Sequence, residues 1–338
     1  SPLARQAKSA RERYGVDVRK QTMSTGVALV AEWLRPVVDA MSRELFSGSQ
    51  NDRSYVQMDE TPIKYLKPGT GKTARGYLWA VHVPGGDTVY HWHPGRGQEC
   101  LEKIIPHDFR GNVQCDGYAV YPALQKRRRG VEGANAIELS GCLAHVRRKF
   151  WEALEQGQDV VRNRWVLRQI QLLYRIEARL RESRAGPAKR EAVRQSESRP
   201  VFDRLENALH RFEKSRKHLP KSLTGKAISY ALKQWCSLSR WLEDGRFEID
   251  NNLIENKIRP TKLGAKNWLF IGAEEAGWRS AVIYSIIESC RNHGIEPYAY
   301  IADVLERLPA MTTDQIKDVL PSAWKARQAE SASELKAA

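Results

Sequence analysis

The feature that most constrains the fold is a change of periodicity near residue 54. Beyond it, three runs alternate apolar and polar residues and are separated by Gly/Pro turns: "YVQMDETPIKYL", "GYLWAVHV" and "DTVYHWH". Alternation with a period of two is typical of half-buried strands, and short turns favour antiparallel neighbours. The sequence therefore predicts an antiparallel meander from this point.

Residues 1–48 have a helical period instead, with Pro36 as an expected kink. The apolar residues that recur at three-to-four spacing are Val27, Val30, Trp33, Leu34, Val37, Val38, Met41 and Leu45. The preceding "YGVDVRKQTMSTG" is compatible with the end of a helix-turn-helix or with a plain helical hairpin, and we favour the hairpin.

After the meander, helix and strand patterns alternate. "GQECLEKII" predicts a helix, "GNVQCDGYAVY" a strand ending in a turn, "NAIELSGC" a strand and "LAHVRRKFWEALE" a helix. The order β-β-β-α-β-α-β-α predicts an α/β module with a mixed sheet flanked by helices.

The rest of the chain reads as helical. Residues 161–245 lack strand alternation, which predicts an all-helical insertion with a break at "SRAGPAKRE". A short helix of about two turns follows "DNN" and ends at Pro260, and longer helices are expected from about Glu274 to Asn292 and from Pro297 to Leu308. The last dozen residues are expected to be disordered.

A chain of 338 residues exceeds the usual single core, so several modules are expected. We predict a helical segment over 1–48, the first part of a catalytic α/β domain over 49–160 and the helical insertion over 161–245. The α/β domain is completed over 246–295, and 296–338 form a C-terminal helix and tail.

Charge points to a polyanionic partner. The chain has 55 Lys+Arg against 40 Asp+Glu, a net charge of +15 and a pI near 9.6. Residues 161–245 alone hold 20 Lys+Arg and 9 Asp+Glu, so 20 − 9 = +11 of the excess lies in the expected insertion.

Five scattered cysteines without a CxxC pair are typical of reduced thiols in a cytosolic protein. No apolar run approaches the length of a membrane span, and the first residues have no signal-peptide core. We therefore expect a cytoplasmic protein.

Three carboxylates stand out. Asp59 lies within the first strand run, Asp116 follows "NVQC" where a strand gives way to a turn, and Glu255 lies in the short helix after "DNN". A carboxylate among apolar neighbours costs free energy unless it is paired or binds a cation. Oxygen ligands of this kind suit Mg²⁺ or Mn²⁺, and two such ions would support nucleotidyl transfer.

The stretches "MDETP", "CDGYAVY", "GCLAHVRRKF", "DNNLIENKIRP", "LGAKNWLF" and "AVIYSIIESCRNHGIEPYAYIADVL" closely resemble the DDE transposases of bacterial insertion-sequence family sixty-six. The resemblance covers roughly residues 10 to 325, in the family's order. It implies an RNase H-like fold and assigns Asp59, Asp116 and Glu255 as the three catalytic acids, which bind two Mg²⁺ or Mn²⁺ ions.

The resemblance also implies partners. They are the DNA of transposon terminal repeats and of the target, further copies of the chain on paired ends, and accessory proteins of the same element; on DNA, the protein would be associated with the nucleoid. Members usually carry a Cys-rich, zinc-binding segment ahead of this region, and none is visible in this sequence, so end recognition is expected to depend on residues that are missing from it. The activity implied is DNA cleavage at transposon ends and 3′-hydroxyl strand transfer. The alternative is a non-catalytic DNA-binding relic or regulator with the same fold.

Six residues are candidates for contacting DNA: His145, Arg147, Arg148, Asn252, Arg259 and Lys262. Cys142 and His145 form a C-x-x-H pair that could be half of a zinc site, but a packed Cys and a capping or DNA-facing His is favoured. Arg259 follows Glu255 by four residues, whereas Pro260 disturbs the same argument for Lys262.

Other signals compete with these. "KPGTGKT" resembles a P-loop but lacks its first glycine and precedes a strand pattern, so we predict a basic hairpin turn and no ATP binding. The basic run Lys126 to Arg129 is either a phosphate clamp or a solvated loop. Asp250 rivals Glu255 as third ligand, but a helix cap is preferred.

Aromatic and imidazole side chains leave two further alternatives. Trp268 and Phe270 could stack on a flipped base, but burial against the sheet is favoured. His91 and His93 share one strand face and are expected to be solvated rather than bound to metal.

Overall fold

The computed structural model describes residues 2–47, 54–129, 137–215, 217 and 219–337. The chain forms two compact units. The first combines Ser1–Arg110 with Leu253–Ala338, and the second is the intervening Gly111–Asn252. The chain therefore leaves the first unit once and returns to it at the segment that carries Glu255.

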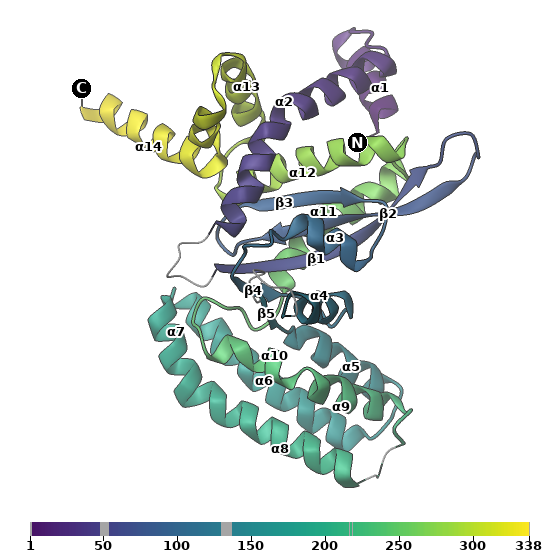
Figure 1. The fold of residues 1–338 in the computed structure, drawn as a ribbon, viewed down its shortest axis with the longest axis vertical. Helices are drawn as coiled ribbons and strands as arrows, with labels where there is room; N and C mark the ends of the chain where they lie inside the picture. Colours follow the sequence, from purple (N-terminus) through teal and green to yellow (C-terminus); the bar gives the residue numbers. More distant parts are fainter. Residues whose placement is uncertain (1, 48–53, 130–136, 216, 218, 338) are drawn as a thin grey trace. The chain divides into compact units, whose positions relative to one another are not determined.

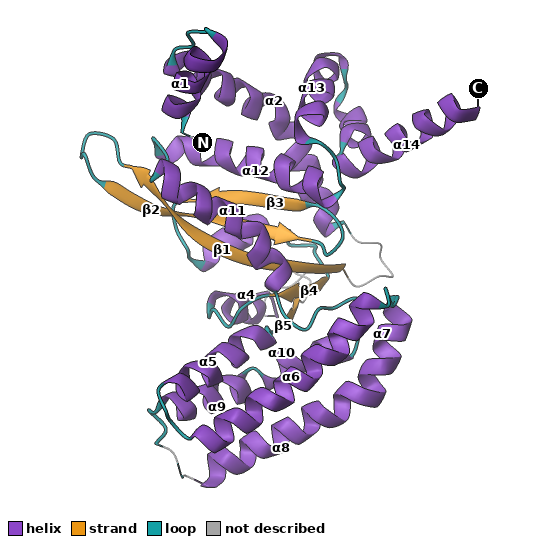
Figure 2. Ribbon diagram, turned by 180° about the vertical axis from the view of Figure 1, so that it is seen from behind, coloured by secondary structure: helices purple, strands orange, loops and turns teal. Residues whose placement is uncertain are grey.

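The first unit is built on an antiparallel meander of three strands, β1 (Ser54–Leu66), β2 (Thr73–His82) and β3 (Thr88–His93) (Figures 1 and 2). This confirms the strands expected from the alternating pattern. The β1–β2 hairpin closes through a hydrogen bond of 2.9 Å from Lys67 N to Lys72 O. Gly69 and Gly71 have φ of 72° and 61°, which favours glycine at both positions of the turn.

The helices of the first unit surround this meander. They are α1 (Leu3–Tyr14), α2 (Lys20–Phe46), α3 (Gln98–Ile104), α11 (Asn252–Trp268), α12 (Gly277–Asn292), α13 (Pro297–Arg307) and α14 (Pro321–Ala337). Three short 3₁₀ segments, η3 (Glu274–Ala276), η4 (Leu308–Ala310) and η5 (Thr313–Val319), connect the last four. The long helix before Asn292 and the helix from Pro297 are confirmed.

Two expectations for these helices were wrong. The helix bearing Glu255 does not end at Pro260 but continues to Trp268, because Ile258 and Thr261 are buried on either side of the proline and outweigh the lost hydrogen bond. The C-terminal residues expected to be disordered belong to helix α14 as far as Ala337, and Ala338 lies outside the described residues.

Helix α2 buries a narrower stripe than the sequence predicted. Leu34, Val37, Val38, Met41 and Leu45 are buried as expected. In contrast, Val27 and Trp33 are exposed, Trp33 at 47%, and Val30 is half-buried. The predicted helix is therefore confirmed. Its apolar spacing begins before Ala31, whereas its buried residues run only from Ala31 to Phe46.

Helix α12 protects the outer edge of the sheet. The backbone N–H groups of Thr88 and Tyr90 on β3 donate to Ser289 Oγ at 2.9 Å and Ser285 Oγ at 2.8 Å. Both views show α12 running beside β3 (Figures 1 and 2). Serine hydroxyls thus replace the strand partner that an exposed edge would otherwise recruit.

The second unit pairs two parallel strands, β4 (Gly111–Gln114) and β5 (Ile137–Ser140), with a helical array. Its helices are α4 (Val120–Arg129), α5 (Leu143–Glu155), α6 (Val160–Glu182), α7 (Pro187–Val193), the π-helical turn η1 (Arg194–Ser198), α8 (Arg199–Ser215), α9 (Leu223–Lys233), α10 (Trp235–Ser239) and the 3₁₀ turn η2 (Arg240–Leu242). Beyond Ser140, the described residues of this unit contain no strand, as expected of the insertion.

With antiparallel and parallel strand pairs flanked by helices, the chain is a mixed α/β protein. The predicted fold class, an RNase H-like arrangement with helical N-terminal, inserted and C-terminal segments, is confirmed. Among the described residues, no helix combines the length and the apolar character needed to cross a bilayer.

A buried ion network holds the helical array together. Arg194 is fully buried, donates from Nε and Nη2 to both carboxylate oxygens of Glu177 at 2.8 Å, and donates from Nη1 to the carbonyls of Trp241 and Asp244. Arg190 bridges Glu177 to Glu248. Burial raises the pKa of Glu177, but the hydrogen bonds and charges of the two arginines outweigh it and hold this pKa below its ordinary value.

Replacing Arg194 by Met should lower the free energy of unfolding by about 3–5 kcal/mol, because the buried Glu177 would keep Arg190 but lose both hydrogen bonds from Arg194. The network's contribution is present above the ordinary Glu pKa of about 4.3 and is lost as the pH falls through the lower folded pKa. Urea unfolding at neutral and acidic pH measures both effects. The control is Arg179→Met, which breaks an exposed pair with Glu197 and should cost at most about 1 kcal/mol. Equal losses in the two variants would contradict the account.

Candidate functional site

Asp59 lies in the interior of β1, where neighbouring residues on both faces of the strand are buried. Its side chain is half-buried, and Oδ1 accepts a hydrogen bond of 2.8 Å from the backbone N–H of Glu60. The period of two places Gln57, Thr61 and Ile63 on the same face, and all three are buried. Ala80 of β2 stands directly opposite Asp59.

Helix α11 covers this face of the meander. Ile254 and Ile258 form one buried apolar cluster with Ile63, Leu78 and Ala80. Gln57 adds a polar contact, because its Oε1 accepts the backbone N–H of Ile254 at 3.1 Å. The first turn of a helix has N–H groups without internal partners, and here a strand side chain supplies one.

Glu255 follows Ile254 in that first turn of α11 and is half-buried. The structure therefore brings Asp59 and Glu255 onto adjoining elements of one unit, a strand and the helix packed on it. Sequence reasoning did not single out Gln57 as the residue that positions this turn. The available signal was the position of Gln57 two residues before Asp59, which puts both side chains on one face of the strand.

Asp116 belongs to the second unit and directly follows β4 and Cys115. Its Oδ1 accepts a hydrogen bond of 2.9 Å from the backbone N–H of Tyr118, which fixes a tight turn. Gly117 within this turn is required by space, since a Cβ there would lie 2.6 Å from the Tyr230 hydroxyl oxygen. The carboxylate is half-buried.

Two neighbouring acids are already engaged. Glu60 points to the opposite face of β1 from Asp59 and accepts from Arg96, with Nε to Oε1 at 2.7 Å. Asp250 accepts the Tyr174 hydroxyl at 2.7 Å, the backbone N–H of Asn252 at 3.0 Å and the Asn252 amide at 2.9 Å. These bonds fit the cap that we preferred for Asp250 over a role as metal ligand.

Comparison with known proteins decides the family. The family described as "Transposase IS66 family" matches residues 1–279, and the one described as "IS66 C-terminal element" matches residues 285–322. The chain belongs to the IS66 transposase family.

Two relatives of this family member are proteins of Sinorhizobium fredii (strain NBRC 101917 / NGR234). "Uncharacterized protein y4jD" is 32% identical over 342 residues, covering 97% of this chain and 63% of the relative. "Uncharacterized protein y4qI" is 32% identical over 326 residues, covering 93% and 58%. The chain thus spans about three-fifths of the length of the curated relatives it matches.

The six residues predicted to contact DNA lie on two helices of this IS66-family chain. Arg147 and Arg148 are exposed on α5, with His145 half-buried in its first turn, and Asn252 begins α11. Arg259 and Lys262 are exposed on α11. Because α11 continues through Pro260, Lys262 at seven residues from Glu255 shares its face as Arg259 does, which removes the geometric objection to it.

The donor set of the three predicted acids fits a hard divalent cation. All three side chains are half-buried carboxylates with oxygen donors only, the ligand type that Mg²⁺ and Mn²⁺ prefer. Cys142 is buried at the start of α5.

The "GKT" segment forms the hairpin turn between β1 and β2 and does not open a helix, as predicted. The run Lys126 to Arg129 ends helix α4 instead of forming a loop, and Arg128 within it is buried, so only part of the run faces solvent.

Of the predictions for the aromatic and histidine side chains, some are confirmed and others were wrong. Trp268 packs against the cluster formed by α11 and the sheet, but Phe270 is 40% exposed. The prediction that His91 is solvated was wrong, because burial lowers its pKa to about 4 and its Nε2 has no hydrogen-bond partner among the described residues. His91 is therefore neutral at physiological pH.

Replacing Gln57 by Leu should lower the free energy of unfolding by about 1–3 kcal/mol. The substitution keeps the volume but leaves the buried N–H of Ile254 without its acceptor. Chemical denaturation measures the loss, and amide hydrogen exchange at Ile254 should become faster. The control Gln171→Leu alters an exposed glutamine on α6 and should change stability by less than about 0.5 kcal/mol. Unchanged exchange at Ile254 would contradict this role of Gln57.

Proposed function

We propose that this chain is the catalytic region of a DNA transposase, which cuts at transposon ends and joins the 3′-hydroxyls to target DNA. The observation that carries the proposal is the packing of α11 on β1, which sets Glu255 beside the strand bearing Asp59 in a member of the IS66 transposase family.

The catalytic acids in this proposal are Asp59, Asp116 and Glu255, which together hold two Mg²⁺ or Mn²⁺ ions. When bound, such ions would supply Lewis-acid chemistry that activates water or a 3′-hydroxyl and stabilises the leaving oxygen of the phosphodiester. The chain's own contribution is to orient the carboxylates. Asp59 is fixed by the strand and Asp116 by its bond to Tyr118, and Glu255 by the turn bonded to Gln57.

Basic residues of the same helix serve the substrate. Arg259 and Lys262 lie on the face of α11 that carries Glu255, so they are placed to bind phosphates next to the cleaved bond. Asn252, Arg147, Arg148 and His145 extend this role to the second unit. We also propose that the protein acts as a multimer on paired ends, with accessory proteins of its element.

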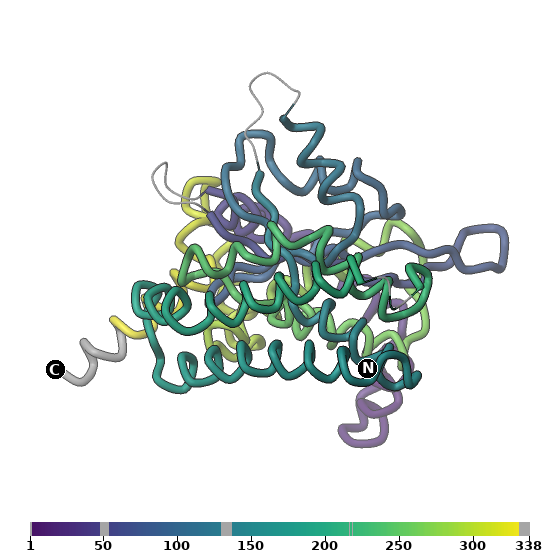
Figure 3. The backbone as a smooth tube through the Cα atoms, turned by 90° about the horizontal axis from the view of Figure 1, so that it is seen from below, coloured from purple at the N-terminus to yellow at the C-terminus, as the bar shows by residue number. Residues whose placement is uncertain are grey.

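A pair of like charges on neighbouring strands of the β1–β2 hairpin supports a polyanionic partner. Lys64 and Arg75 stand directly opposite each other in the register, and both are exposed. Like charges at opposed positions destabilise a sheet, and binding to a polyanion would compensate the repulsion between Lys64 and Arg75. The hairpin projects from the rest of its unit with Lys67 and Lys72 near its tip (Figures 1 and 3).

Asp59→Asn, Asp116→Asn and Glu255→Gln should each reduce cleavage and strand transfer by at least about a hundredfold, because losing a direct ligand exceeds the cost of disturbing an outer one. The assay uses a labelled transposon-end duplex, Mg²⁺ or Mn²⁺, and the full-length protein. Glu32→Gln, at an exposed acid on α2, is the control and should keep its activity.

The alternative of a DNA-binding relic makes the opposite prediction. It expects all variants, and the unaltered protein, to bind the duplex without metal-dependent product. Product from any of the three acid variants at the level of Glu32→Gln would remove that residue from the site.

Arg75→Glu separates binding from folding in the hairpin. It should raise stability by about 0.2–1 kcal/mol, since it converts a like-charged pair with Lys64 into an opposite one. The same change should weaken duplex binding and reduce the salt dependence of log K by about one unit per lost phosphate contact. Lys20→Glu, an exposed lysine at the start of α2, is the control. Duplex affinity equal to that of Lys20→Glu would exclude the hairpin from DNA binding.

A further inference from the structure

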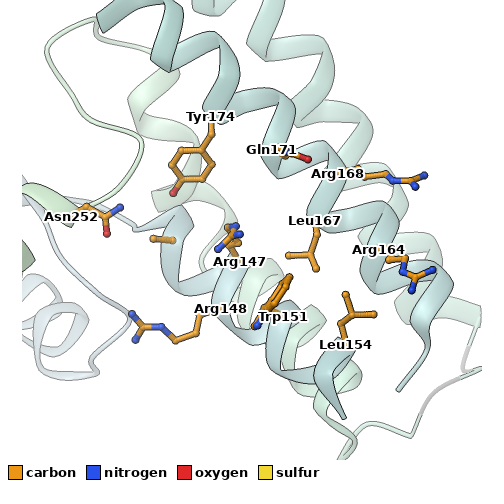
Figure 4. A pocket seen from close by; sticks show the side chains of 11 residues that line it. Arg147, Arg148, Trp151, Leu154, Arg164, Leu167, Arg168, Gln171, Tyr174 and Asn252 are labelled. Atoms are coloured by element: carbon orange, nitrogen blue, oxygen red, sulfur yellow. The ribbon is translucent and has the colours of Figure 1, made fainter. Parts of the chain in front are cut away.

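The second unit contains an open groove between α5 and α6 with a volume of about 930 Å³ (Figure 4). Its lining combines two kinds of side chain. Apolar and aromatic groups come from Ala144, Trp151, Leu154, Leu167 and Tyr174, and polar or charged groups from Arg147, Arg148, Arg164, Arg168, Gln171 and Asn252. Neither Arg164 nor Arg168 attracted attention in the sequence.

Among the residues that the structure describes, no acid neutralises three of the arginines of this groove. Arg148, Arg164 and Arg168 are exposed, and no carboxylate of the described residues pairs with any of them. Some arginines of the same unit are engaged by acids, as Arg162 is by Asp159 and Arg179 by Glu197. The three groove arginines are not, and because they line one groove they are available to a common anionic ligand.

The floor of the groove is apolar and includes an exposed aromatic ring. Trp151 is 45% exposed, and the guanidinium of Arg147 lies 5.9 Å from its ring centroid. In Figure 4 the side chains of Trp151, Leu154 and Leu167 converge between the two helices, while arginine side chains extend around them. A site for phosphates alone needs no such floor.

One end of the groove is rigidly built. Tyr174 donates its hydroxyl to Asp250, and the same carboxylate accepts the amide of Asn252. The lining on α6 runs from Arg164 to Tyr174, ten residues, or about 15 Å at the helical rise. At about 3.4 Å per phosphate along one strand, this length suits roughly four stacked nucleotides.

We propose that this groove binds a single-stranded segment of DNA, with phosphates on its arginines and a base stacked on Trp151. Cationic rims with an aromatic floor are the combination that binds single strands without sequence preference, whereas a duplex keeps its base faces internal. The proposal deepens the proposed function and rests on it in taking DNA as the ligand. Asn252 also begins α11.

The test measures binding without chemistry. Fluorescence anisotropy of a labelled twelve-nucleotide oligothymidine and of a blunt duplex of equal length, in EDTA, gives Kd for the full chain as a function of salt. Trp151→Ala should weaken single-strand binding about fivefold to a hundredfold and leave duplex binding within about twofold. Arg168→Ala should weaken it several-fold and reduce the single-strand salt slope by about 0.7.

Matched controls lie outside the groove. Arg204→Ala removes an equally exposed, unpaired arginine from α8 in the same unit, and Tyr298→Ala removes an exposed aromatic from α13. Both should leave the single-strand Kd within about twofold. All four positions are exposed, so thermal unfolding should be unchanged, and any variant that melts early is replaced by Trp151→Leu or Arg168→Gln.

The outcomes separate this proposal from the catalytic one. Loss of single-strand binding in the groove variants supports the groove even if no DNA is cleaved. Single-strand affinities equal to those of the controls overturn it, as does an equal loss for duplex, which would mean a general phosphate surface. Cleavage that survives with an inert groove would leave the catalytic proposal intact.

Discussion

A carboxylate in the interior of a strand is the constraint on which the rest of this structure depends. Asp59 is surrounded on its own face by buried residues, and taking a charge out of water costs free energy unless a counter-charge or hydrogen bonds replace it. The neighbouring acids show the ordinary solutions, since Glu60 pairs with Arg96 and Asp250 accepts three hydrogen bonds. Asp59 accepts the backbone N–H of Glu60 and lies on the face of β1 that packs against the helix carrying Glu255.

The placement of Glu255 relies on hydrophobic packing more than on helix propensity. Ile254 and Ile258 bury against β1 and β2, and this burial is strong enough to carry α11 through Pro260. The hydrogen bond from Ile254 N–H to Gln57 fixes the orientation of the first turn of α11, because apolar contacts are not directional. The same logic recurs at the outer edge, where serines of α12 hold β3 through its backbone.

Elements with strong periodicity could be predicted from the sequence, and features that depend on tertiary contacts could not. The alternating runs predicted the three-stranded meander, and the helix expected from Pro297 begins at that residue. Pro260 was expected to end a helix because local rules cannot see Ile258 and Thr261 buried beside it. His91 was expected to be solvated because nothing in an alternating strand shows that its edge is covered. The sequence did not predict the groove arginines, because they come close to Trp151 only when α5 and α6 pack against each other.

Basic residues on the surface accompany acids that a packed core holds in place, and the central proposal is that Asp59 and Glu255 share a bound cation. Fe²⁺ can replace Mg²⁺ at oxygen-ligand sites and, with ascorbate and peroxide, cleaves the backbone next to where it is bound. The direct measurement is therefore mapping of Fe²⁺-dependent cuts in the full chain, with and without excess Mg²⁺. The account predicts paired cuts near Asp59 and near Glu255 that Mg²⁺ suppresses together and that Asp59→Asn abolishes at both places. Cuts at one of these segments alone, or cuts that persist in Asp59→Asn, would contradict it.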